Sequence, residues 1–502
     1  MPTDTDVIVV GAGPTGLLLA GDLASLGVRC ALVERRAGES NLTRAFAVHA
    51  RTLELLDARG LADELLATGS RVRQLRILNS AAVSLADLPT RFPFALVTPQ
   101  YETERLLERR ALAAGVDIRA GVEVRGLRQD DTGVDLDVRL ADGSAATLRA
   151  GYAVGTDGVR STVRRALGLP FPGRSVVRSM MLADVRLTDP PDDVLNASVG
   201  DRGFAFLAPF GDGWYRAIAW DARDQQPDDA DVELDEIRGV FRRVHGTDFG
   251  MHGARWLSRF HSDERQAPRY RVGRAFLAGD AAHVHSPAGG QGMNTGLQDA
   301  ANLGWKLAAA VHGHAPAWLL DSYQAERHPV GTAVLRGSGA LLRLGLGQSL
   351  PLRVARAVGT AVAGRGLVPR KAASTAISGL GIRYAHPRGT HPSVGRRMPD
   401  IAVEPTASGA RRLYEVLRGG RFVLVTCSDH DGELAGWADR VAVVRPSRPN
   451  ATTVLVRPDG YVAWAADEPT AGLADACMHW LGDRAPAVTS AAASGQPDLR
   501  RN

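Results

Sequence analysis

Residues 6–36, DVIVVGAGPTGLLLAGDLASLGVRCALVERR, set the architecture of the N-terminal part of this chain. Apolar runs at 6–10 and 30–33 predict two strands, and the apolar residues of 17–26 predict a helix between them. The turn GAGPTG at 11–16 joins the first strand to the helix. This order is that of a βαβ unit, which predicts a Rossmann-like α/β fold.

The glycines of this turn match the GxGxxG pattern of dinucleotide sites. Gly11 permits the tight turn, Gly13 lets the backbone approach a pyrophosphate, and Gly16 lets helix and strand pack closely. Glu34 ends the second strand, where an acid binds a ribose 2′-hydroxyl. The acid favours an adenosine without a 2′-phosphate, as in FAD or NAD, over NADP at this site.

A second glycine-rich stretch lies at 276–307, FLAGDAAHVHSPAGGQGMNTGLQDAANLGWKL. The apolar run 275–278 predicts a strand that ends at Gly279-Asp280, and the apolar spacing after the loop predicts a helix. A loop with few side chains before a helix N-terminus exposes backbone N–H groups to a flat or anionic ligand. Asp280 could bind a hydroxyl of a sugar or linker; the alternative is a plain strand-to-helix turn.

A third signal is Asp157-Gly158 in GTDGVRSTVRRALG, where a predicted strand again leads into a helix. Ser161 is available to cap that helix. A cofactor could span this turn, and the alternative is an ordinary capped turn.

Residues 175–267 are β-rich and interrupt the nucleotide-binding pattern, which indicates an inserted domain. In GWYRAIAW, side chains alternate, so Trp214, Arg216, Ile218 and Trp220 share one strand face. Arg216 is the candidate for holding an aromatic or anionic substrate, although packing at a sheet edge is the favoured interpretation. No histidine or carboxylate in this insertion can be assigned as a catalytic base.

The C-terminal part has its own α/β pattern. Residues 411–484 read helix, strand, helix, strand, strand, helix, which is a thioredoxin-like order. Cys427 stands where such a fold begins its redox motif, but Ser, Asp and His follow it. Because no partner cysteine is near, dithiol exchange is excluded.

Composition limits the remaining classes of function. The chain has 502 residues, and no apolar run long enough for a transmembrane helix is present. The net charge of +5 comes from arginines interspersed with acids, which does not indicate a nucleic-acid surface. Three cysteines without metal or disulfide spacing, and no signal peptide, predict a cytoplasmic protein. His283 and His285 lack further ligands nearby, so no metal site is predicted.

In combination, the three motifs resemble the FAD-dependent aromatic hydroxylases of the para-hydroxybenzoate hydroxylase type. The similarity includes PAGGQGMNTGLQDAANLGWKLA and SYQAERHPV and covers residues 5 to about 330. The thioredoxin-like tail without CxxC is similar to the branch of aromatic polyketide hydroxylases and rifampicin monooxygenases. One departure is NLTRAFAVHART at 41–52, which is less glycine-rich than in some relatives.

The resemblance assigns each motif to one part of FAD. The first turn and its acid hold the ADP half, Asp280 approaches the ribityl chain, and the backbone after Gly290 approaches the flavin pyrimidine edge. Asp157 is associated with both FAD and a transient NADPH. Arg44 and Gln100 approach the pyrophosphate and linker, and the backbone of Val124 approaches the adenine. The expected cofactor contacts are Gly11, Gly13, Pro14, Thr15, Gly16, Glu34, Arg35, Arg44, Gln100, Val124, Asp157, Asp280, Pro287, Gly290, Gln291, Gly292, Met293 and Asn294.

The implied reaction is monooxygenation of a phenolic polycyclic, polyketide-type substrate. NADPH or NADH reduces FAD, O2 adds to form a flavin C4a-hydroperoxide, and the phenolic ring attacks its distal oxygen. The alternatives are Baeyer–Villiger or antibiotic-inactivating oxygenation, and a non-catalytic FAD-binding protein. A flavin halogenase is disfavoured because GWYRAIAW is not a WxWxIP-like motif.

We expect no nucleic-acid or membrane partner, and the oligomeric state is left open, a homodimer included. The expected domains are an FAD-binding domain at 1–174, with 71–100 on the substrate side; a β-sheet substrate domain at 175–267; the second part of the FAD-binding domain with helices at 268–391; and a thioredoxin-like domain at 392–502, with a disordered tail from about 487.

Overall fold

The structure is a computed structural model, and it describes residues 5–38, 45–77, 81–191, 195–200, 202–227, 229–286, 289–346, 370–468 and 472–484. Arg44, Pro287 and the predicted C-terminal tail lie outside the described residues. None of the helices in the described ranges combines the length and hydropathy that a bilayer span requires.

The first sheet has six strands in the order β18-β19-β12-β1-β2-β8. The strands are β1 Val7–Val10, β2 Cys30–Glu34, β8 Asp117–Ala120, β12 Tyr152–Gly155, β18 Arg271–Val272 and β19 Ala275–Leu277. All neighbouring pairs from β19 to β8 are parallel, and β18 alone is antiparallel to its neighbour β19. Helix α1, Pro14–Ser25, lies between β1 and β2 in the chain, which confirms the predicted βαβ unit.

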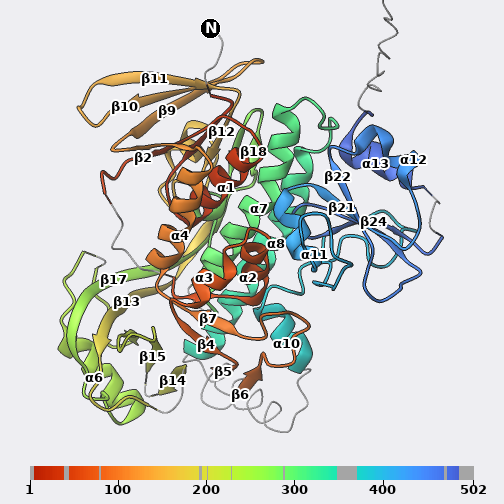
Figure 1. Cartoon of the computed structure of the whole chain (residues 1–502). Helices are drawn as coiled ribbons and strands as arrows, with labels where there is room; N and C mark the ends of the chain where they lie inside the picture. The colour runs from red at the N-terminus through yellow and green to blue at the C-terminus, as the bar shows by residue number, and fades with distance from the viewer. Residues whose placement is uncertain are drawn as a thin grey trace, which may run out of the picture.

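Helices cover this parallel sheet because its inner strands β1, β2, β12 and β19 are largely apolar and buried. Helix α1 packs against α4, Gln100–Ala113, and α7, Gln291–Val311. A three-stranded antiparallel sheet lies beside the nucleotide-binding core (Figure 1). Its strands are β9 Glu123–Gln129, β10 Val134–Arg139 and β11 Ala145–Ala150.

The second large sheet is antiparallel, with the order β14-β15-β16-β13-β17-β20. It comprises β13 Gly173–Arg186, β14 Asn196–Gly200, β15 Gly203–Pro209, β16 Tyr215–Asp221, β17 His252–Gln266 and β20 His283–Val284. One face packs on α6, Leu234–His245, and the other face carries most of the aromatic side chains. Because β20 belongs to the second glycine-rich stretch, this sheet meets the nucleotide-binding core at that loop.

Smaller elements connect the two sheets. Strands β3 Ala47–Val48, β4 Ser70–Val72 and β7 Ala95–Val97 form one small sheet, and β5 Gln74–Ile77 pairs with β6 Ala81–Ser84. The connecting helices are α2 Ala50–Asp57, α3 Ala62–Leu66, α5 Thr162–Ala166, α8 Asp321–Leu346 and α10 Arg370–Ile377.

The C-terminal part has a four-stranded sheet, β22-β21-β23-β24. Its strands are β21 Phe422–Val425, β22 Val441–Val444, β23 Thr453–Val456 and β24 Val462–Ala466, with helices α11 Leu413–Val416, α12 Asp431–Leu434 and α13 Leu473–Leu481. Strand β21 is parallel to β22 and antiparallel to β23. The predicted order of helices and strands is present, except that the last of the three predicted strands is a hairpin formed by β23 and β24. Trp305 and Ala309 of α7 join its core, so this part packs directly on the nucleotide-binding core (Figure 1).

Candidate functional site

The three sequence motifs meet at one edge of the first sheet. Glu34 ends β2, Gly11 follows β1, Asp157 follows β12 and Asp280 follows β19. These four strands are adjacent and parallel, so their carboxyl ends point to the same edge. Ligands of open α/β sheets bind at this edge. Strand order therefore brings together motifs that are far apart in the sequence.

The glycines of the first turn serve two different purposes. A Cβ on Gly16 would collide with the carbonyl oxygen of Gly11, and a Cβ on Gly11 would lie 2.7 Å from the carbonyl oxygen of Thr156. These two glycines are required by the fold. A Cβ on Gly13 would meet nothing within 4 Å, and its φ of −75° suits any residue. The open space at Gly13 is where a ligand can approach the backbone.

Glu34 is held against the glycine turn. Its Oε2 accepts a hydrogen bond from the backbone N–H of Ala12 at 2.9 Å, and its Oε1 accepts from Nε of Arg36 at 2.9 Å. Burial raises the pKa of Glu34, but Arg36 and the Ala12 N–H outweigh burial and leave the pKa below its ordinary value. The carboxylate is thus ionised at the position from which it can accept ribose hydroxyls.

Asp157 caps a helix and retains an unused oxygen. Its Oδ2 accepts hydrogen bonds from the N–H groups of Thr162 at 2.6 Å and Val163 at 3.2 Å. Ser161 Oγ accepts from the Arg164 N–H at 2.9 Å, which confirms the predicted cap of α5. The other oxygen, Oδ1, is buried and has no hydrogen-bond partner within the described residues. A ligand group can satisfy that oxygen.

The N-terminus of α7 is open to a ligand. Gly290 precedes the helix with a φ of +63°, and no side chain caps it. The first N–H groups of this 21-residue helix therefore have no intrahelical acceptor. Such a helix start favours negative charge.

Asn294 secures this loop through its side chain. Its Nδ2 donates to the carbonyl oxygens of Gly290 at 2.7 Å and Ala47 at 2.9 Å, and its Oδ1 accepts from the His49 N–H at 2.8 Å. Nε2 of His49 lies 2.8 Å from the Gly289 carbonyl oxygen. The loop is therefore tied to β3 and to the start of α2.

The remaining predicted contacts surround the same edge. Asp280 is exposed at the end of β19, Arg35 is exposed after β2, and Thr15 packs against Gly279. Gln100 starts α4 and its Oε1 accepts a hydrogen bond from the Ala45 N–H at 3.0 Å. The others are Pro14 at the first position of α1, Val124 in β9 beside the end of β2, and Gln291, Gly292 and Met293 in the first turn of α7.

Models of two protein families match the chain, and together they cover most of its length. Residues 4–338 match the model of the FAD binding domain, and residues 391–484 match that of the aromatic-ring hydroxylase C-terminal domain. The chain belongs to the FAD-dependent aromatic-ring hydroxylases.

Individual relatives agree with this assignment. Rifampicin monooxygenase of Streptomyces venezuelae is 42% identical over 476 residues, covering 92% of this chain and 96% of the relative. The 12-dehydrotetracycline 5-monooxygenase/anhydrotetracycline 6-monooxygenase of Streptomyces rimosus is 39% identical, covering 95% and 99%. Among solved structures, OxyS anhydrotetracycline hydroxylase from Streptomyces rimosus has a TM-score of 0.85 at 39% identity, covering 96% of this chain and 100% of that one. FAD is thus the cofactor of this hydroxylase, and NAD(P)H and O2 are expected with it.

Arg216 of the hydroxylase is fully buried and paired. Its Nε lies 2.6 Å from Asp184 Oδ1, and its guanidinium stacks over the ring of Phe210 at 5.2 Å. Trp256 lies on another side at 5.6 Å. This environment corresponds to the packing interpretation of Arg216 rather than to a free anion-binding group.

His283 and His285 stack with ring centroids 5.8 Å apart and planes tilted by 7°. His283 bonds Asp299, whereas neither ring nitrogen of His285 has a hydrogen-bond partner within the described residues. Burial, and then the neighbouring His283, lower the pKa of His285 to about 3, so its ring is neutral at ordinary pH. The described residues contain no group of three or more metal-ligating side chains.

Sequence reasoning missed Phe46, Ala47 and His49, which border the α7 loop. Ala47 and His49 bond Asn294, and the ring of Phe46 lies 5.1 Å from that of Phe206 on β15. In the sequence their stretch, 41–52, differs from some relatives in having fewer glycines, and its apolar run FAVHA is typical of any buried strand. Their role depends on contacts with residues about 160 to 250 positions away.

Proposed function

We propose that this hydroxylase uses NADPH, FAD and O2 to oxygenate a phenolic polycyclic substrate. The observation that carries the proposal is the convergence of Glu34, Gly13, Asp157 and the open α7 N-terminus at one sheet edge. FAD, when bound, supplies hydride acceptance and oxygen activation. The chain's own residues bind and orient the reactants and exclude water.

The ADP half of FAD is assigned to the first turn. Gly13 offers space for the pyrophosphate, and Glu34 offers an ionised carboxylate for the ribose. The flavin edge is assigned to the backbone after Gly290, where the α7 dipole stabilises developing negative charge. Asp280 and Gln100 are assigned to the linker, together with Arg44 and Pro287 outside the described residues.

The substrate is assigned to the aromatic face of the second sheet. Phe206 and Phe204 on β15 and Trp220 on β16 are only partly buried there, and Phe46 joins them from the side of the α7 loop. Residues 289–294, at the start of α7, are called the α7 loop or flavin loop. Flat apolar side chains beside it suit a flat aromatic ligand. The names of the relatives, which include tetracycline and rifampicin monooxygenases, support polycyclic substrates.

The reductant is assigned as a co-substrate that binds only transiently. The sequence holds one GxGxxG turn, and the first sheet has one acid positioned beside it. NADPH therefore has no second motif of its own, in agreement with a co-substrate that leaves after reduction. NADH is the alternative reductant.

The test is NADPH consumption by the purified flavoprotein under air, with a panel of polycyclic phenols and their O-methyl ethers as matched controls. We expect strong acceleration by a phenol, weak acceleration by its ether, and a product that gains one labelled oxygen atom from 18O2. Slow oxidation that yields only hydrogen peroxide with every phenol would contradict the proposal.

Antibiotic inactivation or Baeyer–Villiger insertion is the second candidate, because the rifampicin monooxygenase relative is 42% identical. The product structure separates the outcomes: a new ring hydroxyl supports hydroxylation, and an inserted ring oxygen supports the Baeyer–Villiger reaction. A non-redox role is the third, since a 36% identical relative is named dialkyldecalin synthase. Product formation without NADPH consumption would identify it.

We further propose a cytoplasmic location without nucleic-acid or membrane partners. The three cysteines, Cys30, Cys427 and Cys477, are free thiols in the fold, which suits a reducing compartment. A homodimer is the assembly to test, by light scattering of the FAD-loaded protein.

A further inference from the structure

Helix α2 carries three buried charged side chains that the flavin site does not explain. Arg51, Glu54 and Asp57 are each 1% exposed, and every residue of this helix is buried. Buried charges are retained in proteins when they are paired and hydrogen-bonded. The partners of these three side chains therefore identify the segments that α2 connects.

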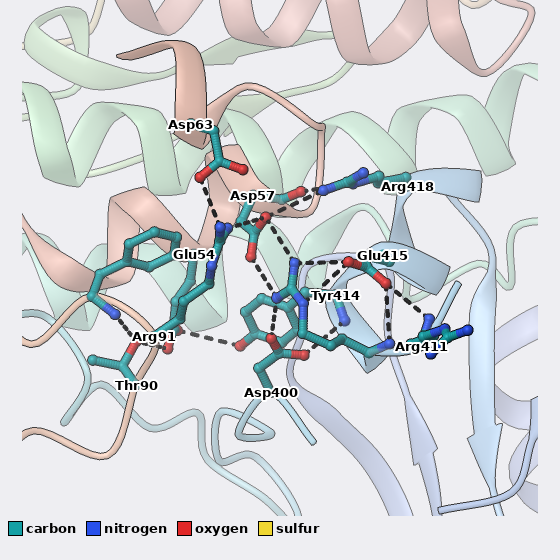
Figure 2. Close-up of polar contacts among 12 residues, drawn as sticks. Glu54, Asp57, Asp63, Thr90, Arg91, Asp400, Arg411, Tyr414, Glu415 and Arg418 are labelled. Carbon is teal, nitrogen blue, oxygen red and sulfur yellow. Dashed lines mark hydrogen bonds and ion pairs between the residues drawn. The ribbon is translucent and has the colours of Figure 1, made fainter. Parts of the chain in front are cut away.

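The acids of α2 have partners in the C-terminal domain, in addition to Arg51, Thr90 and Arg91 of the N-terminal part. Glu54 Oε1 lies 2.6 Å from Nη1 of Arg397, and Glu54 Oε2 accepts from the Tyr414 hydroxyl at 3.2 Å. Asp57 Oδ2 lies 2.9 Å from Nη1 of Arg412. Figure 2 shows Tyr414 directed toward Glu54 and Arg418 directed toward Asp57.

Arg51 extends the contact to a C-terminal turn. Its Nη2 donates to the carbonyl oxygen of Asp459 at 2.5 Å, and its Nη1 donates to the Tyr414 hydroxyl at 3.1 Å. The Asp459 side chain in turn accepts from Nδ2 of Asn302 on α7 at 3.3 Å. One C-terminal turn thus contacts both α2 and the helix that begins at the flavin loop.

The N-terminal end of α2, which carries Arg51, also holds the flavin loop. His49, directly before the helix, bonds Asn294 and the Gly289 carbonyl oxygen. An eight-residue helix spans roughly 12 Å, so α2 is a short rigid link between this loop and the C-terminal domain. Buried hydrogen bonds thus join Asp459 and Tyr414 to Arg51, and His49, two residues earlier in the chain, bonds Asn294, so the backbone at the start of α2 connects the two sets of contacts.

We propose that the C-terminal domain is a brace that preorganises the flavin loop through α2 and α7. The inference rests on the assignment of the α7 loop as part of the flavin site. A domain with a single exposed cysteine, Cys427, and one buried cysteine, Cys477, has no dithiol chemistry to perform. Holding the loop in its binding geometry lowers the ordering cost when FAD binds. By linkage, FAD binding must strengthen domain docking by the same factor.

The test uses the full chain carrying Tyr414→Phe and Arg412→Gln, with Arg411→Gln as the matched control. Arg411 is exposed and contacts Glu415 through its backbone N–H, so its side chain leaves the α2 contacts intact. FAD affinity is measured by flavin fluorescence well below the melting temperature, and amide hydrogen exchange is followed in peptides covering 289–294 and 413–418. The single variant Tyr414→Phe, which leaves every charge paired, serves if the double variant does not fold.

We expect the brace variants to weaken FAD binding by about 5- to 150-fold, the usual range of coupling between sites. Exchange of 289–294 in the FAD-free protein should rise, and FAD should slow exchange of 413–418 in the wild type. A lower melting temperature with unchanged FAD affinity and unchanged loop exchange would overturn the proposal. If FAD failed to protect 289–294 even in the wild type, the flavin-loop assignment, rather than the brace, would be wrong.

Discussion

Oδ2 of Asp299 lies 2.6 Å from Nε2 of His283, and both side chains are completely buried. The same carboxylate accepts hydrogen bonds from Nε of Arg327 at 2.7 Å and from the Gly279 N–H at 3.1 Å. Burial raises the pKa of Asp299, but its contacts with Arg327 and His283 outweigh burial and leave the pKa below its ordinary value. Asp299 on α7 therefore ties α8 to the turn before Asp280.

Replacing Asp299 should destabilise the protein strongly. Asp299→Asn leaves the buried guanidinium of Arg327 without its counter-charge, and we expect a loss of about 3–5 kcal/mol in the free energy of unfolding. Urea denaturation followed by circular dichroism measures this loss. The matched control is Asp321→Asn, whose 75% exposed carboxylate pairs with Arg271 and should contribute less than about 1 kcal/mol. Equal losses in the two variants would show that the buried pair contributes no more to the free energy of unfolding than the exposed pair does.

Gly13→Val should abolish FAD binding while the fold is retained. A Cβ at this position meets no protein atom within 4 Å and needs no unusual φ, so we expect the valine to fill the space assigned to the pyrophosphate. Bound flavin per polypeptide and the melting temperature of the FAD-free protein are the measurements. Gly16→Val is the contrasting variant, because its Cβ would collide with the Gly11 carbonyl oxygen and should unfold the domain. Full FAD content in Gly13→Val would refute the assignment of the first turn.

Acid should destabilise the fold partly through His285. Its pKa of about 3 lies below the ordinary value of 6.5, so between these pH values the unfolded chain binds a proton that the folded protein does not. Stability therefore falls as the pH drops from about 6.5 toward 3. His285→Phe keeps a ring against His283 and removes this proton.

The free energies of unfolding of wild type and His285→Phe are compared from pH 7 to pH 4. We expect the wild type to lose more, by at most about 1.4 kcal/mol per pH unit. Parallel curves would mean that the buried ring does not titrate as its surroundings indicate.

Arg216→Met should lower stability rather than substrate affinity. The substitution leaves Asp184, 3% exposed, without its main partner, and we expect a loss of about 3–5 kcal/mol. The double variant with Asp184→Leu removes both charges and should recover much of that loss. Unfolding free energies are measured beside the KM for the accepted phenol. A raised KM at unchanged stability would instead place Arg216 in contact with substrate.

Much of the fold could be predicted because the signals are local. The βαβ unit at 6–36 follows from apolar periodicity and three glycines, and the strand before Asp280 follows from a run of four apolar residues. The cap of α5 by Ser161 and the thioredoxin-like order of the C-terminal strands depend on the same short-range patterns. The first turn and its acid predict a dinucleotide with a free ribose 2′-hydroxyl, FAD or NAD, and the resemblance to the aromatic hydroxylases is what selects FAD.

Other features could not be predicted from local patterns. Arg216 pairs with Asp184, which is 32 residues away in the sequence, and Glu54 pairs with Arg397, which is 343 residues away. Asn294 was expected to present its backbone to the flavin, yet its side chain is committed to Ala47 and His49. Each of these pairs forms only when strand order and helix packing have brought distant segments together. Residue type and spacing determined which chemistry this chain can support. Long-range packing determined which charged side chains face a ligand and which stabilise the fold. The reason is that a buried charge is tolerated only beside a partner, and the fold provides that partner.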